Sequence, residues 1–256
     1  MNTLHHHYYF SDMGVMLGRS MRHIFRSMDT IITVTITPIA MLLLFVYVFG
    51  GAIQAGTDTY VNYILPGILL MAIASGVAYT SYRLFIDVQR GIFERFHSMP
   101  IVRSAALWGH VITSLVSNAI SVAVIILVAF IIGFRSPGGI LSWLAAAGIL
   151  CLFTLALTWL AVIAGLSAKS VDGAGAFAYP LIFLPFISSA FVPTRTMVTA
   201  VRVFAEHQPV TPIVNSLRAL LSGQPVGNDI FSALLWCVGI LGAAYFFALW
   251  IYKKRV

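Results

Sequence analysis

Apolar segments long enough to cross a lipid bilayer dominate this sequence. A hydrocarbon core about 30 Å thick requires about 20 mostly apolar residues in an α-helix. We expect helices and not barrel strands, because the segments do not alternate between apolar and polar residues with a period of two. The sequence therefore predicts an all-α integral membrane protein. Six transmembrane helices are expected, at residues 31–53, 61–82, 105–133, 140–168, 174–193 and 230–252.

The composition excludes an ordinary soluble domain. Apolar residues make up 60% of the chain and charged residues 9%, whereas about a quarter of the residues in a soluble domain are charged. The net charge of +7 comes from single basic residues beside apolar segments, so we expect the lipid bilayer as a partner and no nucleic acid. Cys151 and Cys237 lie inside apolar segments, where they predict small buried side chains and neither a disulfide nor a metal site.

Lysine and arginine residues near the ends of the spans indicate the orientation of the chain, because they resist translocation across the membrane. With a cytoplasmic N-terminus, the residues outside are Arg135, Arg195, Arg202 and Arg218. All the others then lie inside, and an even number of spans returns the C-terminus to the cytoplasm. This cytoplasmic set is Arg19, Arg22, Arg26, Arg83, Arg90, Arg95, Arg103, Lys169, Lys253, Lys254 and Arg255.

The first segment outside the spans is the N-terminal one. Residues 1–29 form a predicted cytoplasmic amphipathic segment, and residues 30–256 form the six-span domain. Between Ser11 and Asp29 apolar residues recur at helical spacing, which indicates a helix lying in the cytoplasmic membrane interface. The basic side of this interface helix carries Arg19, Arg22 and Arg26.

Two further segments lie between spans. The cytoplasmic loop 83–104 has an apolar stripe at helical spacing, so it is either a helix or a solvated loop. Within it, Arg90 and Glu94 are four residues apart and can pair along one side of a helix. The external segment 194–229 predicts two short surface helices, the second beginning at Thr211-Pro212 and ending at Gly223.

The chain lacks the residues that would power transport by itself. Ion-coupled carriers bury charged residues in their spans, but the central parts of these spans contain none, and His110 is the single titratable candidate near a span. A phosphate-binding loop needs two glycines before Lys169-Ser170, and Ile163 and Ala168 occupy those positions. We therefore expect no catalytic residues, no metal site and no cofactor on this chain, and energy supplied by a partner.

Two motifs resemble the ABC-2 class of ATP-binding-cassette exporter permeases, particularly its daunorubicin-resistance-like branch. The first is Arg-Gly-Ile-Phe-Glu-Arg-Phe-His-Ser-Met-Pro at residues 90–100, after the second span. The second combines Gln-Pro-Val-Thr-Pro at 208–212 with Leu-Arg-Ala-Leu-Leu-Ser-Gly at 217–223, before the last span. The similarity extends over nearly the whole chain, and its implications for partners are the following.

The resemblance implies a bacterial cytoplasmic membrane protein that works as a dimer on two cytoplasmic ATPase subunits, which hold ATP and Mg. The second permease is another copy of this chain or a close paralogue. The resemblance also implies short re-entrant helices between the last two spans, an N-terminal helix that touches the ATPase, and a coupling helix in the loop after the second span. The implied ATPase-coupling residues are Arg90, Gly91, Phe93, Glu94, Arg95, Phe96 and Pro100.

The sequence thus predicts a transporter permease, not an enzyme, that exports a hydrophobic or amphipathic molecule such as a drug, an antibiotic or a lipid. An uncharged lining cannot offset the desolvation of a small ion. Two alternatives remain: export of a polysaccharide or glycolipid by the same machinery, and a membrane scaffold that transports nothing. Candidate residues of the substrate pathway, on the second and fifth spans, are Met71, Ser75, Tyr79, Phe183, Phe186 and Phe191.

Overall fold

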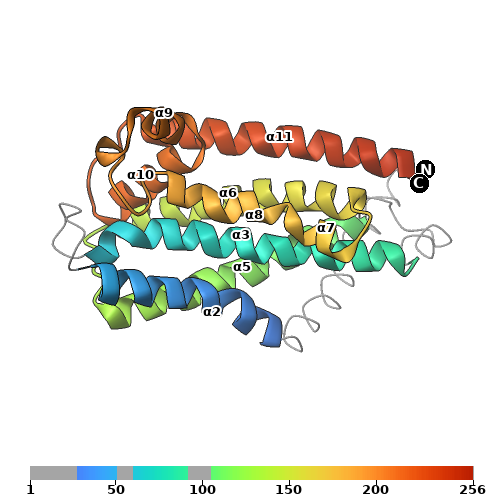
Figure 1. The fold of residues 1–256 in the computed structure, drawn as a ribbon, viewed down its shortest axis with the longest axis horizontal. Coiled ribbons are helices and arrows are strands. Elements are labelled where there is room, and N and C mark those ends of the chain that lie inside the picture. Colours follow the sequence, from blue (N-terminus) through green and yellow to red (C-terminus); the bar gives the residue numbers. More distant parts are fainter. Residues whose placement is uncertain (1–27, 51–59, 92–104, 256) are drawn as a thin grey trace.

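The computed structural model describes residues 28–50, 60–91 and 105–255, and every regular element in these ranges is a helix. Within these ranges, four helices are long and apolar enough to cross a membrane. They lie along the long axis of the molecule, where α3, α6 and α11 run in one direction and α5 runs in the opposite one (Figure 1). These helices are α3 (Tyr60–Gln89), α5 (Ala105–Ile132), α6 (Ile140–Ser167) and α11 (Asp229–Arg255).

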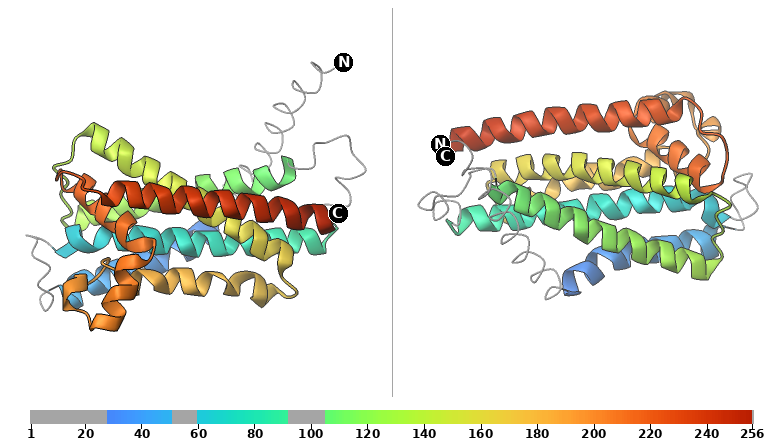
Figure 2. Two further views of the ribbon diagram at one scale, coloured as in Figure 1. Left: turned by 90° about the horizontal axis from the view of Figure 1, so that it is seen from above. Right: turned by 180° about the vertical axis from the view of Figure 1, so that it is seen from behind.

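The first predicted span is shorter than the four long helices. Helix α2 (Met28–Leu44) continues into the π-helical turn η1 (Phe45–Phe49). The predicted span 31–53 therefore ends, as a described helix, at Phe49. Helix α2 lies at one side of the molecule, and α11 lies against α6 at the opposite side (Figure 2).

The fifth predicted span, 174–193, is broken into three short helices: α7 (Val171–Ala176), α8 (Ala178–Phe183) and the 3-10 helix η2 (Leu184–Ile187). Proline lacks a backbone donor and its ring obstructs the preceding turn, so Pro180 and Pro185 disfavour a continuous α-helix here. From Ser188, which is extended, to Pro193 the chain is not helical.

Helix α3 is the centre of the bundle. It packs against α2, α5, α6, α7, α8 and α10, and nearly every residue of its first half is buried. Glycines allow close approach to its neighbours, since a Cβ on Gly67 would lie 2.5 Å from the Ala190 Cβ and one on Gly165 would lie 2.8 Å from the Ser81 carbonyl oxygen. Such small-residue contacts are the usual way in which membrane helices pack closely.

A hydroxyl network joins three of these helices in the interior. Thr80 donates to Ser114 over 3.0 Å, and Ser114 and Thr158 share a second bond of 3.0 Å, so α3, α5 and α6 are linked. Asn118 Nδ2 donates to the Ser114 carbonyl over 2.9 Å. Its Oδ1 has no hydrogen-bond partner among the described residues and lies against Gly76, where a Cβ would be 2.2 Å away.

The segment predicted to be external contains η3 (Thr194–Thr196), α9 (Thr199–His207) and α10 (Val210–Leu221). Two short helices lie where they were predicted, but α10 is not a surface helix, because nine of its twelve residues are buried. Gly223 ends α10 as predicted: its φ is +63°, its N–H donates to Leu220, and the Gln224 N–H donates to Ala219, which is a Schellman motif. The predicted start is wrong by two residues, because Pro209 and not Thr211 is the N-cap residue and α10 begins at Val210. Thr211 does not cap α10, because its hydroxyl donates to the Ala205 carbonyl.

Candidate functional site

The non-helical end of the fifth segment lies inside the protein. Ser188, Ser189, Ala190 and Phe191 are all buried. Backbone polar groups without helical partners are tolerated at membrane depth only where protein or water satisfies them. In this segment, side chains from α3 and from residues 208–218 donate hydrogen bonds to the backbone carbonyl groups.

Gln208 and Tyr60 bind two of these carbonyl oxygens. The Gln208 side-chain amide donates to Ile187 over 3.0 Å, and the Tyr60 hydroxyl donates to Phe191 over 3.1 Å. Ser188 stabilises the turn from within, because its hydroxyl donates to Pro185 over 2.6 Å and accepts the Ala190 N–H over 3.0 Å. The Gln-Pro-Val-Thr-Pro motif therefore positions the broken segment.

Arg218, on α10, binds the carbonyl oxygens of Ser189 and Ala190 in this turn. Its Nη2 donates to Ser189 over 2.7 Å and to Tyr63 over 3.1 Å, and its Nη1 donates to Asn215 Oδ1 over 3.2 Å. The guanidinium carbon also lies 3.8 Å from the centre of the Tyr63 ring, a cation–π geometry. We call these acceptors, together with the Ala190 carbonyl and the Tyr63 ring, the guanidinium site.

No carboxylate neutralises Arg218 among the residues that the structure describes. Among the described residues, the ion pairs join Asp87 to His110 and Arg202 to Glu206. Sequence reasoning counted Arg218 as one of the external charges and did not assign it to a site. The available signal was its place in the Leu-Arg-Ala-Leu-Leu-Ser-Gly motif, although that motif does not reveal the acceptors.

The three phenylalanines predicted for the pathway come together beside this turn. Phe186 stacks on Phe191 with ring centroids 4.8 Å apart, and Phe183 lies 6.1 Å from Phe186. Phe45 of η1 stacks on Phe191 at 4.7 Å. This aromatic cluster (Phe45, Phe183, Phe186, Phe191) extends from a buried ring, Phe191, to one that is 60% exposed, Phe183.

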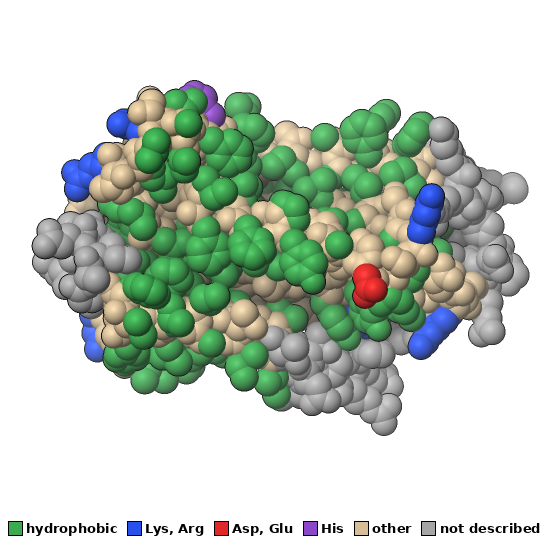
Figure 3. All heavy atoms as spheres, in the orientation of Figure 1, with side chains coloured by type: hydrophobic (Ala, Val, Ile, Leu, Met, Phe, Trp, Pro, Cys, Tyr) green, Lys and Arg blue, Asp and Glu red, His purple; other side chains and the backbone are tan. Residues whose placement is uncertain are grey.

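The pathway residues predicted on α3 are not equivalent. Met71 is buried in the core. Ser75 and Tyr79 are half-buried, and the Ser75 hydroxyl donates to the Met71 carbonyl of its own helix over 3.0 Å. Helices α3 and α8 are in contact, and on the face that carries α8 hydrophobic side chains cover the middle while lysine and arginine lie towards the ends (Figure 3). Ser75, Tyr79 and Phe183 thus remain candidates for an uncharged lining.

Helix α3 extends beyond the predicted span 61–82 and ends at Gln89. Gly91 has a φ of +65°, and a left-handed glycine stops a helix. Arg90 therefore follows the end of α3, and the predicted pairing of Arg90 with Glu94 stays a prediction because Glu94 lies outside the described residues. Arg90 and Gly91 are the described members of the coupling set. Phe93, Glu94, Arg95, Phe96 and Pro100, and the interface residues Arg19, Arg22 and Arg26, lie outside the described residues.

An ion pair lies where this loop leaves the bundle. His110 Nε2 on α5 is 3.2 Å from Asp87 Oδ2 on α3, and the two side chains are 17% and 32% exposed. The pair joins the last turn of α3 to the first turns of α5, with the 92–104 loop between them. Sequence reasoning considered His110 alone, because spacing along the chain does not show that Asp87 lies opposite.

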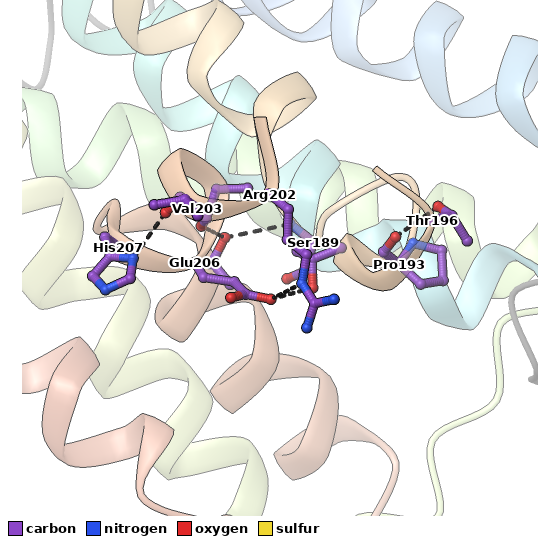
Figure 4. A network of polar contacts seen from close by, with 10 residues as sticks. Ser189, Pro193, Thr196, Arg202, Val203, Glu206 and His207 are labelled. Atoms are coloured by element: carbon purple, nitrogen blue, oxygen red, sulfur yellow. Dashed lines mark hydrogen bonds and ion pairs between the residues drawn. The ribbon is translucent and has the colours of Figure 1, made fainter. Parts of the chain in front are cut away.

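Helix α9 carries Arg202 and Glu206, whose side chains point towards each other (Figure 4). Arg202 donates to Glu206 over 2.8 Å, and this hydrogen bond holds the pKa of the Glu206 carboxyl below its usual value. Ala205 is the one buried residue of α9. Arg202 is therefore an exposed, ion-paired arginine, in contrast to Arg218.

Comparison with known proteins decides the family. The sequence profile of the ABC-2 type transporter family matches residues 12–222, most of the chain. The chain belongs to the ABC-2 type transporter family. It is also 26% identical over 250 residues, covering 93% of this chain and 87% of the relative, to "Daunorubicin resistance ABC transporter permease protein DrrB1" of Streptomyces coeruleorubidus. The predicted resemblance and the all-α membrane fold are thus confirmed for this ABC-2 permease.

Proposed function

We propose that this chain is the membrane-spanning subunit of an ATP-driven exporter and moves a hydrophobic or amphipathic molecule out of the cytoplasm or the inner leaflet. The family match over residues 12–222 carries this proposal. The relative is named as a daunorubicin resistance permease, which supports a lipophilic drug or antibiotic as the cargo. In this proposal both termini are in the cytoplasm of a bacterial cell and the protein lies in the cytoplasmic membrane.

The surface around α8 supports an uncharged pathway. Phe183 is 60% and Tyr179 63% exposed on this short helix. Helix α8 contacts α3, which carries the half-buried Ser75 and Tyr79. Aromatic rings and hydroxyl groups can contact a lipophilic molecule without the cost of burying an unpaired charge. A second copy of the chain, or a close paralogue, facing this surface would enclose the pathway.

The energy source is a separate cytoplasmic ATPase, present in two copies and carrying ATP and Mg. The absence of a phosphate-binding loop from the sequence supports this division of labour. The loop 92–104 and the N-terminal segment 1–29 are the proposed contacts with that subunit. In the ATPase cycle, displacement of the loop would be transmitted to α3 and α5, which the Asp87–His110 pair joins.

Reconstitution tests the proposal. The purified chain in lipid vesicles should hydrolyse no ATP, whereas the chain reconstituted with the ATP-binding-cassette ATPase that co-purifies with it should hydrolyse ATP faster when a lipophilic anthracycline is added. An ATPase whose phosphate-loop lysine is replaced is the control. ATP hydrolysis by the isolated chain would contradict the proposed division of labour.

The same reconstitution separates the alternatives. Stimulation by a glycolipid and not by the anthracycline would favour a polysaccharide or glycolipid exporter. Association with the ATPase, without transport or stimulation by either class of molecule, would favour a scaffold.

A further inference from the structure

The geometry points to Arg218 as a positioning residue that holds the outer end of the substrate pathway closed. Its guanidinium ties the non-helical residues 188–190 to α3 and α10. The inference rests on the proposed export function, because it concerns the route by which a substrate leaves. Three features of the guanidinium site support it.

The first feature is the chemistry of the acceptors. All of them are neutral: backbone carbonyl oxygens of Tyr63, Ser189 and Ala190, the amide oxygen of Asn215 and the face of the Tyr63 ring. A buried ion pair would lock two charges together, since breaking it leaves an unpaired charge. Bonds to neutral carbonyl groups can be exchanged for bonds to water, so the closed arrangement is held without being permanent.

The second feature is the distribution of these acceptors. They belong to α3, to the turn after η2 and to α10, so relative movement of any two of these elements breaks part of the site. The turn itself has no helical hydrogen bonds that must be broken before it moves. Tyr60, Gln208, Thr211 and Asn215 each bond to this turn from one element, whereas the Arg218 guanidinium bonds to the turn and to α3 at once.

The third feature is the continuity of the turn with the aromatic cluster. Phe191 follows Ala190 directly, and its ring stacks on Phe186 and on Phe45. Displacement of residues 188–190 would move Phe191 and loosen these stacks. A change that opens the guanidinium site at the external surface would thus also rearrange the aromatic rings of the proposed uncharged lining.

Thiol accessibility tests the inference without requiring transport. Ser189 is 6% exposed, so in a chain lacking Cys151 and Cys237 a Ser189→Cys variant should react slowly with an impermeant maleimide. Loss of a charge-assisted hydrogen bond should shift the closed equilibrium about tenfold or more. We therefore expect Arg218→Ala to raise the labelling rate by about this factor, and free guanidinium ion to reverse the increase.

Matched variants exclude trivial causes. Arg202→Ala removes an exposed external arginine and should leave the labelling rate at Ser189→Cys unchanged. Arg218→Lys keeps the charge but loses the planar array of donors, so the cysteine of Ser189→Cys should be labelled at an intermediate rate in this variant. If Arg218→Ala does not accumulate in the membrane, Arg218→Lys replaces it in the test. Gln224→Cys, which lies on the exposed loop after α10, reports that the reagent reaches this end.

The outcomes separate this inference from the proposed function. Unchanged labelling in both Arg218 variants, or an equal increase in Arg202→Ala, would overturn the positioning role whatever the transport assay gives. Increased labelling that guanidinium reverses, in a chain that transports nothing with its ATPase, would leave the role of Arg218 intact and count against export. In an active exporter, Arg218→Ala should also lower the amount of substrate moved per ATP hydrolysed.

Discussion

Asp87 and His110 illustrate how two residues on separate helices can act as one unit. Their side chains meet where α3 and α5 leave the bundle, on either side of the 92–104 loop. Both are partly exposed, and ion pairs of this kind contribute less than about 1 kcal/mol to stability. The value of the contact is therefore geometric: it fixes the distance between the two ends of the loop.

We expect Asp87→Asn and His110→Gln each to lower transport per ATP while leaving the amount of protein in the membrane near normal. Because the two side chains act through one contact, the double variant should be no worse than either single variant. Transport and ATP hydrolysis by the reconstituted complex measure this ratio. Asp172→Asn, which changes an exposed acid on α7, is the control, and additive losses in the double variant would contradict the pairing.

At the scale of elements, the fifth segment shows what hydropathy cannot predict. Its apolar residues predicted a span at 174–193. The non-helical turn, however, exists because Gln208, Arg218 and Tyr60 bind its carbonyl groups from distant parts of the chain. By contrast, α5 and α6 begin and end within one residue of their predicted bounds, since they are apolar throughout.

The loop after α3 carries a prediction at the same scale. Glu94→Ala should leave expression and basal ATP hydrolysis near normal and reduce export steeply, because a carboxylate at a subunit contact can bind a donor on the ATPase. Glu94 lies outside the described residues, so this role stays a prediction that the transport assay tests. Export at the unmodified rate, with equal protein in the membrane, would reduce Glu94 to a solvated charge.

At the scale of the whole molecule, the described helices run back and forth between two ends (Figure 1). The C-terminal ends of η1, α5 and α10 lie at one end, and those of α3 and α11 lie at the other. The four basic residues predicted to be external belong to segments at the first of these two ends. Arg135 follows α5, and Arg195, Arg202 and Arg218 belong to the segment between η2 and α11.

The orientation is tested with two single cysteines in a chain lacking Cys151 and Cys237. An impermeant thiol reagent on intact cells should label Gln224→Cys and not Ser98→Cys, because the latter lies in the predicted cytoplasmic loop. Permeabilised cells should show labelling of both. Labelling of Ser98→Cys behind a sealed membrane would reverse the predicted topology.

The sequence therefore predicted the membrane class, the family and the positions of the long helices, because these follow from apolar length and local motifs. It did not predict the guanidinium site or the Asp87–His110 contact, because each joins residues more than 20 positions apart. Of the pathway residues, the phenylalanines were predicted together on one segment. Their stacking on Phe45 depends on how η1 packs, which spacing does not encode.

The length of α3 has a mechanical consequence. Its 30 residues measure about 45 Å, whereas the hydrocarbon core is about 30 Å thick, so part of the helix projects beyond the membrane as a stiff rod. A tilt of about 5° would displace one end of such a rod by about 4 Å relative to the other. Asp87 lies near one end and the Tyr63 carbonyl near the other. A push on the loop would thus reach Arg218 through leverage along a single helix.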